Sequence, residues 1–161
     1  MNKTFYLYGF MGSGKSYLGR ITAAELNLRF VDLDEYIVNR ECVQIAEIFG
    51  KYGEQHFRKL ELTALKEIDT DIISLGGGAL TDTDTAAFVR GSGGVVIYID
   101  TPFEVCYERI MNDTSRPLAS GKSREELLTL YNSRAGHYKN IADYITKGED
   151  LCSFITQELK R

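Results

Sequence analysis

The sequence predicts an α/β fold of three layers, in which a parallel sheet of five strands lies between layers of helices. Short apolar runs typical of buried strands alternate along the chain with segments of helical spacing, and this alternation favours parallel strands joined by helices. A glycine-rich loop separates the first apolar run, Phe5-Tyr6-Leu7-Tyr8, from a helical segment at 17–26. The 161 residues contain no repeat or linker-like stretch, so we expect a single domain over residues 1–161.

Apolar runs, glycines, prolines and capping residues define the individual elements. Asp34 stands where a helix begins, Thr81 or Asp82 can cap a later helix, and Pro102 suits the first turn of another. The predicted strands are at 5–8, 29–34, 71–75, 95–99 and 143–145. The predicted helical segments are at 17–26, 35–40, 45–49, 54–68, 82–90, 102–111 and 124–138, with a last helix from 150.

The glycine-rich loop, Gly9-Phe10-Met11-Gly12-Ser13-Gly14-Lys15-Ser16, matches the phosphate-binding pattern Gly-x-x-x-x-Gly-Lys-Ser/Thr at every fixed position. In such a loop the backbone N–H groups and the start of the helix hold phosphates. Lys15 would reach the outer phosphates and Ser16 would ligate Mg²⁺. We therefore expect a bound nucleotide, held by Gly12, Ser13, Gly14, Lys15, Ser16 and Tyr17.

Polar and glycine residues follow two further predicted strands. Asp32 and Asp34 end the second strand, and Gly76-Gly77-Gly78 follows the third. Because ligands of parallel sheets bind at the carboxyl ends of the strands, these residues should meet the phosphate-binding loop. The sequence thus predicts one site with a nucleotide, two carboxylates and an open backbone surface.

Composition and charge exclude several classes of partner. The net charge is −4 and the pI about 5.3, so the chain has no basic surface suited to nucleic acid or to anionic membranes. We expect no membrane span and no leader sequence, and hence a cytoplasmic protein, for which we expect a monomer. Cys42, Cys106 and Cys152 lack metal-ligand spacing and fit free thiols in a reducing compartment.

Several separated motifs together resemble the shikimate kinases, small kinases of the nucleoside-monophosphate-kinase fold. The Phe57-Arg58-x-x-Glu61 element and the triple glycine, in this order and spacing, are the most specific of them. The others are the phosphate-binding loop, Asp32-x-Asp34, Ile45-x-x-Ile48-Phe49, Gly53-Glu54, Arg116-Pro117-Leu118 and Arg134. The resemblance runs from Thr4 to about Tyr144, with an acceptor-binding region at about 34–61.

The resemblance implies that ATP, with Mg²⁺, phosphorylates the 3-hydroxyl of shikimate in aromatic amino-acid biosynthesis. Arg58 and Arg134 suit the acceptor's carboxylate, because guanidinium groups form bidentate bonds with carboxylates. Asp34 would orient the attacking hydroxyl and take its proton, while Ser16 and Asp32 would bind the metal. By the same resemblance Gly77 and Gly78 lie against the acceptor, and Glu61 holds Arg58 in place. Taken by itself, the spacing of Arg58 and Glu61 favours a surface ion pair, but the other motifs favour a role in the site.

Two regions should complete the nucleotide site. The polar segment 112–122 lies between two helical patterns and is predicted to be a lid that excludes water from the site. Within it, Arg116 would neutralise charge on the transferring group together with Lys15. Arg109 corresponds to a family position that stacks on adenine, or is a plain surface arginine. The segment 146–150 is shorter than the adenine loop typical of the family.

Two other functions remain possible from the sequence. One is another small-molecule kinase of the same fold, such as a gluconate kinase, in which the acceptor pocket differs. The other is a regulatory module that binds nucleotide without turnover. Arg58, Arg134 and the triple glycine argue against the first, and the presence of Lys15, Asp34 and Arg116 together argues against the second.

Overall fold

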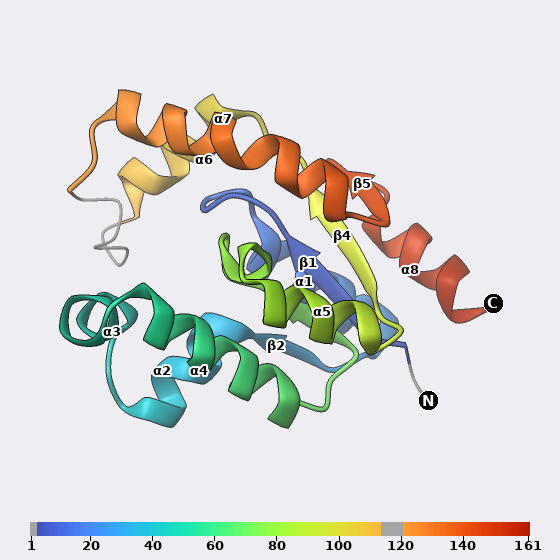
Figure 1. The fold of residues 1–161 in the computed structure, drawn as a ribbon. Coiled ribbons are helices and arrows are strands. Elements are labelled where there is room, and N and C mark those ends of the chain that lie inside the picture. Colours follow the sequence, from blue (N-terminus) through green and yellow to red (C-terminus); the bar gives the residue numbers. More distant parts are fainter. Residues whose placement is uncertain (1–2, 114–120) are drawn as a thin grey trace.

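A computed structural model describes residues 3–113 and 121–161. Five strands form one sheet in the order β2-β3-β1-β4-β5, and every neighbouring pair is parallel. The strands are β1 (Phe5–Tyr8), β2 (Phe30–Asp32), β3 (Ile72–Ser74), β4 (Val95–Ile99) and β5 (Tyr144–Thr146). The predicted three-layer α/β fold with a five-stranded parallel sheet is confirmed (Figure 1).

Helices connect the strands and cover both faces of the sheet (Figure 1). The α-helices are α1 (Lys15–Leu26), α2 (Leu33–Glu41), α3 (Ile45–Tyr52), α4 (Glu54–Glu67), α5 (Thr83–Gly91), α6 (Phe103–Asn112), α7 (Arg124–Ile141) and α8 (Leu151–Leu159). A short 3-10 helix, η1 (Ala79–Thr81), follows the triple glycine and was not expected from the sequence. No helix among the described residues is both long and apolar enough to cross a membrane.

The alternation of side chains along the central strands divides the core into two parts. On β1, Phe5 and Leu7 pack with residues of α1 and α8, whereas Tyr6 and Tyr8 pack with residues of α2 to α7. All four side chains are buried. Strands that are apolar on both faces are typical of parallel sheets covered by helices, which is why β1 reads as a continuous apolar run.

Helix caps fix the starts of the elements that approach the site. Asp82 accepts from the backbone N–H of Thr85 at 2.9 Å and begins α5, as one of the two predicted caps. Asp34, by contrast, lies inside the first turn of α2. The cap of α2 is Asp32, whose carboxylate accepts from the N–H of Glu35 at 3.0 Å, so the expected helix start is two residues too late.

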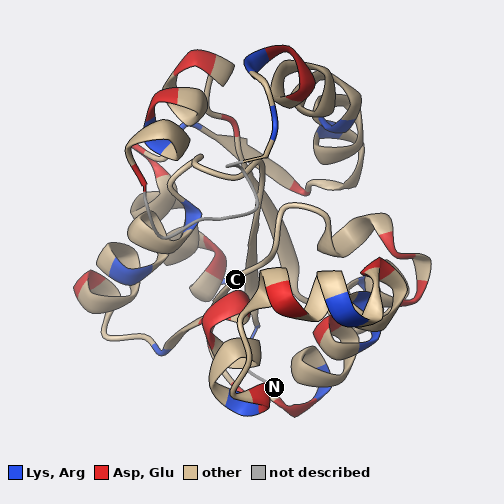
Figure 2. Cartoon of the chain, turned by 90° about the vertical axis from the view of Figure 1, so that its left-hand side faces the viewer, with Lys and Arg blue, Asp and Glu red and all other residues tan. Residues whose placement is uncertain are grey.

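Lys and Arg positions are interleaved with Asp and Glu positions on the helices (Figure 2). Exposed pairs such as Arg20 with Glu35 and Arg40 with Glu67 join neighbouring elements. Pairs of this kind contribute little to stability, roughly 0–1 kcal/mol each.

Candidate active site

The loop between β1 and α1 is folded around its own lysine. Lys15 is buried, and its Nζ donates hydrogen bonds to the carbonyl oxygens of Gly9 at 2.8 Å and Phe10 at 2.9 Å. Gly14, at the N-cap of α1, has φ 92°, a left-handed conformation that favours glycine. A phosphate is a charged acceptor and binds an ammonium more strongly than neutral carbonyls do. The lysine is thus placed to exchange these loop contacts for a phosphate.

A cavity of about 150 Å³ opens beside the start of α1. Arg109, on α6, donates from Nη1 to the carbonyl oxygen of Gly12 at 3.2 Å, and Tyr17 is 69% exposed. Ser13 is buried below the cavity, where its carbonyl accepts from the Thr101 hydroxyl at 2.9 Å. The cavity is lined by Gly12, Gly14, Lys15, Ser16, Tyr17, Arg109, Ile110 and Asp113. A helix N-terminus with two cations at one cavity provides the charge that an anionic ligand needs.

Ser16, Asp32 and Ser74 bring three side-chain oxygens together next to this cavity. The Ser16 hydroxyl donates to the Asp32 carboxylate, and the hydroxyl oxygens of Ser16 and Ser74 are 3.3 Å apart. Asp32 and Ser74 are the last residues of β2 and β3, and Ser16 lies in the first turn of α1. Hydroxyl and carboxylate oxygens are the ligands that Mg²⁺ prefers, together with water and phosphate, so the donor set fits this metal.

Two guanidinium groups meet at Gly78, after β3. A Cβ atom on Gly78 would lie 2.4 Å from Nη2 of Arg58 and 3.2 Å from Nη2 of Arg134. Arg58 comes from α4 and Arg134 from α7, so two separate helices each bring one guanidinium group to the triple glycine. Because like charges repel, two adjacent guanidinium groups favour a carboxylate between them.

Two carboxylates lie on the other side of the same glycine segment. A Cβ atom on Gly76 would lie 2.7 Å from Oε1 of Glu61 and 3.3 Å from Oδ1 of Asp34. Glu61 is fully buried, and its Oε2 accepts from Nη1 of Arg58 at 2.6 Å. Burial raises the pKa of Glu61 to about 7, although the Arg58 charge acts in the opposite direction. The pair is therefore a buried element of the site and not a surface ion pair.

The structure brings together most of the residues expected from the sequence. Lys15, Ser16, Tyr17 and Arg109 share one cavity, and Arg58 and Arg134 meet at Gly78. Arg116 and most of the expected lid over 112–122 lie outside the described residues.

Two contacts of the site were not expected from the sequence. The hydroxyl of Tyr138, on α7, donates to the carbonyl oxygen of Gly77 at 2.7 Å and so fixes the triple glycine. Glu54 accepts from Nη2 of Arg58 at 3.0 Å. The sequence did hold a signal for both residues. Tyr138 lies four residues from Arg134, and Glu54 lies four residues from Arg58, so each shares a helix face with an arginine of the predicted site.

The fold and this arrangement define a class of protein. A phosphate-binding loop after the central strand faces a pocket with convergent guanidinium groups and carboxylates, which is the arrangement of a P-loop kinase for a small anionic acceptor. The chain belongs to the shikimate kinase family, whose sequence model matches residues 11–160. Shikimate kinase from Staphylococcus aureus strain JH9 is 44% identical over 138 residues, which cover 84% of this chain and 79% of that protein.

Solved structures agree with the family assignment. Shikimate kinase from Acinetobacter baumannii, solved in complex with shikimate, has a TM-score of 0.85 and 32% identity, covering 98% of this chain and 93% of that chain. The enzyme from Aquifex aeolicus has a TM-score of 0.74 and 38% identity, with coverage of 98% and 94%. A gluconokinase from Sinorhizobium meliloti has a TM-score of 0.60 at only 16% identity, with coverage of 98% and 89%, and so shares the fold alone.

Proposed function

We propose that this chain transfers the γ-phosphoryl group of ATP to the 3-hydroxyl of shikimate, a step in aromatic amino-acid biosynthesis. Membership of the shikimate kinase family supports it. The observation that carries it is the convergence of Arg58 and Arg134 at Gly78, at the same edge of the sheet as the phosphate-binding loop. A carboxylate bound between these cations would place a small ring acid beside Asp34.

The donor half of the reaction belongs to the loop and α1. Lys15 and Arg116 neutralise charge that develops on the transferring group, as the family resemblance assigns them. Gly12, Ser13, Gly14, Ser16 and Tyr17 hold the nucleotide together with Lys15. Arg109 lines the same cavity and stacks on the base.

Ser16 and Asp32 would hold Mg²⁺, and the proximity of their oxygens supports this assignment. The ion would offset negative charge on the phosphates of ATP. Addition of a chelator should therefore abolish turnover, and Mg²⁺ in excess of the chelator should restore it.

The acceptor half belongs to the carboxyl ends of β2 and β3. Arg58 and Arg134 bind the carboxylate, Gly77 and Gly78 let the ring approach the backbone, and Asp34 accepts a hydrogen bond from the attacking hydroxyl and takes its proton. Transfer then depends mainly on alignment of the hydroxyl with the γ-phosphorus and on charge neutralisation.

Product identification tests this function. The chain is incubated with ATP, Mg²⁺ and either shikimate or gluconate, and the products are analysed by mass spectrometry. We expect shikimate 3-phosphate and ADP. Phosphorylation of gluconate without that of shikimate would favour the second kinase class, and ATP binding without any product would favour a regulatory module.

We also infer a cytoplasmic monomer without nucleic-acid or membrane partners. The acidic balance of −4 and the interleaved charges of the helices support this assignment. Light scattering of the purified protein at working concentration measures the oligomeric state directly.

A further inference from the structure

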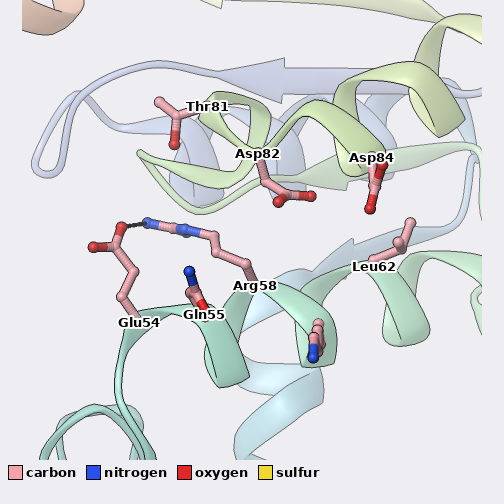
Figure 3. A pocket seen from close by; sticks show the side chains of 8 residues that line it. Glu54, Gln55, Arg58, Leu62, Thr81, Asp82 and Asp84 are labelled. Carbon is pink, nitrogen blue, oxygen red and sulfur yellow. Dashed lines mark hydrogen bonds and ion pairs between the residues drawn. The ribbon is translucent and has the colours of Figure 1, made fainter.

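Arg58 is held by two carboxylates on its own helix. Its Nη1 donates to Oε2 of Glu61 at 2.6 Å. Its Nη2 donates to Oε1 of Glu54 at 3.0 Å, the bond that Figure 3 shows. A guanidinium has five N–H donors, so these two bonds leave others for a ligand. Its Nε is buried and makes no hydrogen bond within the described part of the chain.

The carboxylates around Arg58 differ in how easily they can move. Glu61 is fully buried. Asp82 lines the same groove as Arg58, but it is fixed by bonds from the N–H and hydroxyl of Thr85 at 2.9 and 2.7 Å. Glu54 is the first residue of α4, and its side chain is 62% exposed. It borders a groove of about 350 Å³ between α4 and the start of α5 (Figure 3). Glu54 can therefore leave Arg58 for solvent, whereas Glu61 and Asp82 are held.

The atom that Glu54 holds faces the acceptor site. Nη2 of Arg58 lies 2.4 Å from the position that a Cβ atom on Gly78 would take, and Nη2 of Arg134 lies 3.2 Å from the same position. Two cations at this point favour a carboxylate, and Glu54 supplies one to Nη2 of Arg58, while Glu61 pairs with Nη1. The acceptor and Glu54 thus each offer a carboxylate, and both carboxylates suit the same partner atom, Nη2 of Arg58.

We propose that Glu54 occupies the acceptor carboxylate's place on Arg58 and gives it up when the acceptor binds. This inference rests on the proposed function, because it takes Arg58 as a ligand of the acceptor's carboxylate. The apparent dissociation constant of the acceptor then equals the intrinsic one divided by the fraction of molecules in which Nη2 is free of Glu54. An anion that binds Arg58 alone only replaces Glu54, whereas a carboxylate that also binds Arg134 gains a second cation, so the exchange favours the latter.

A positioning role for Glu54 makes the opposite prediction. A glutamate at a helix start, four residues before an arginine, stabilises the helix by itself. If Glu54 only held Arg58 in its binding orientation, its removal would loosen the guanidinium and weaken acceptor binding. The sign of the change in acceptor KM therefore separates the two roles.

The test is Glu54→Gln, with steady-state kinetics on shikimate at saturating ATP and Mg²⁺. We expect the KM for shikimate to fall about two- to fivefold, with kcat within about twofold, because exposed ion pairs contribute roughly 0.2–1 kcal/mol. Calorimetric titration with shikimate should give the same fall in dissociation constant. The matched control is Glu125→Gln, which removes an exposed acid from the first turn of α7. It should leave the KM and the dissociation constant for shikimate unchanged.

The outcomes distinguish this inference from the proposed function. A wild-type chain that makes no shikimate 3-phosphate contradicts the proposed function itself. A wild-type chain that turns over, with a Glu54→Gln variant whose KM for shikimate is unchanged or higher, overturns only the exchange of carboxylates on Arg58. Thermal denaturation of both variants checks that they are folded like the wild type.

Discussion

Gly78→Ala should damage acceptor binding without unfolding the chain. Gly78 has φ −116° and ψ 5°, which an alanine adopts without positive-φ strain. Its methyl group would lie 2.4 Å from Nη2 of Arg58 and 3.1 Å from Cζ. Nη2 must therefore withdraw by about 1 Å to reach ordinary contact distance. Both atoms are at the end of a flexible side chain, so the guanidinium moves and the backbone stays in place.

The displacement predicts the size of the kinetic effect. A misplacement of about 1 Å at a binding group costs up to about 10²-fold in rate, so kcat/KM for shikimate should fall about 10- to 100-fold, mainly through KM. The KM for ATP should stay within about twofold, because Gly78 does not line the nucleotide cavity. The change in the free energy of unfolding, from urea titration, should be below about 1 kcal/mol.

Gly136→Ala is the matched control. Gly136 lies on α7 close to Arg134, but a Cβ atom there has nothing within 4 Å among the described residues. This variant should keep wild-type kinetics and gain up to about 1 kcal/mol of stability, since alanine favours a helix over glycine. Gly78→Ala could also keep the wild-type kcat/KM for shikimate. The guanidinium groups would then not lie against Gly78 when the acceptor binds, and the assignment of Arg58 as a ligand of the acceptor's carboxylate would be wrong.

Three further substitutions test other parts of the site. Asp34→Asn should leave the dissociation constant of ATP near that of the wild type, which nucleotide titration measures. It should lower kcat by about 10²–10⁴-fold in steady-state kinetics. Near-normal turnover would refute the role of Asp34 in orienting the hydroxyl and taking its proton. Lys15→Ala should lower kcat/KM for ATP by about 10²–10³-fold, and an unchanged value would exclude phosphate contact. Glu61→Gln should alter the pH dependence of stability. In the folded state the pKa of Glu61 is about 7, above its ordinary value of 4.5. Between these two pH values the folded state binds a proton that the unfolded state has lost. The free energy of unfolding of the wild type should therefore fall by up to about 3 kcal/mol as the pH rises from 4.5 to 7. The variant should lack this loss in urea titrations, and parallel curves for both proteins would contradict the raised pKa.

The strands and the site loop were predictable from the sequence because their signals are local. The apolar run at 5–8 and the spacing of glycines and Lys15 in the loop each define one conformation. The start of α2 was less predictable. Asp32 and Asp34 are both good caps, and the choice depends on tertiary contacts, since the carboxylate of Asp32 also bonds to Ser16.

Contacts between distant segments could not be predicted from local pattern. The bond from Tyr138 to Gly77 joins residues 61 positions apart, and a tyrosine on a helix ordinarily indicates packing. The family resemblance predicted that Arg58 and the triple glycine lie at the same acceptor. It could not supply the burial of Glu61, because the same three-residue spacing occurs in exposed ion pairs.

The two halves of the site touch beside the paired ends of two neighbouring strands. Strands β1 and β3 are paired neighbours, and the backbone N–H of Leu75 donates to the carbonyl oxygen of Leu7 at 2.9 Å. Immediately beyond them, a Cβ atom on Gly77 would lie 3.3 Å from the carbonyl oxygen of Gly9, which is one of the acceptors of Lys15. The phosphate-binding loop and the acceptor backbone are thus fixed relative to each other by strand pairing. The adjustable parts are the cations, because Lys15 must leave the loop carbonyls and Arg58 must leave Glu54. ATP thus releases Lys15 from the loop carbonyls, and the acceptor releases Arg58 from Glu54. The paired strand ends hold the two substrates in alignment.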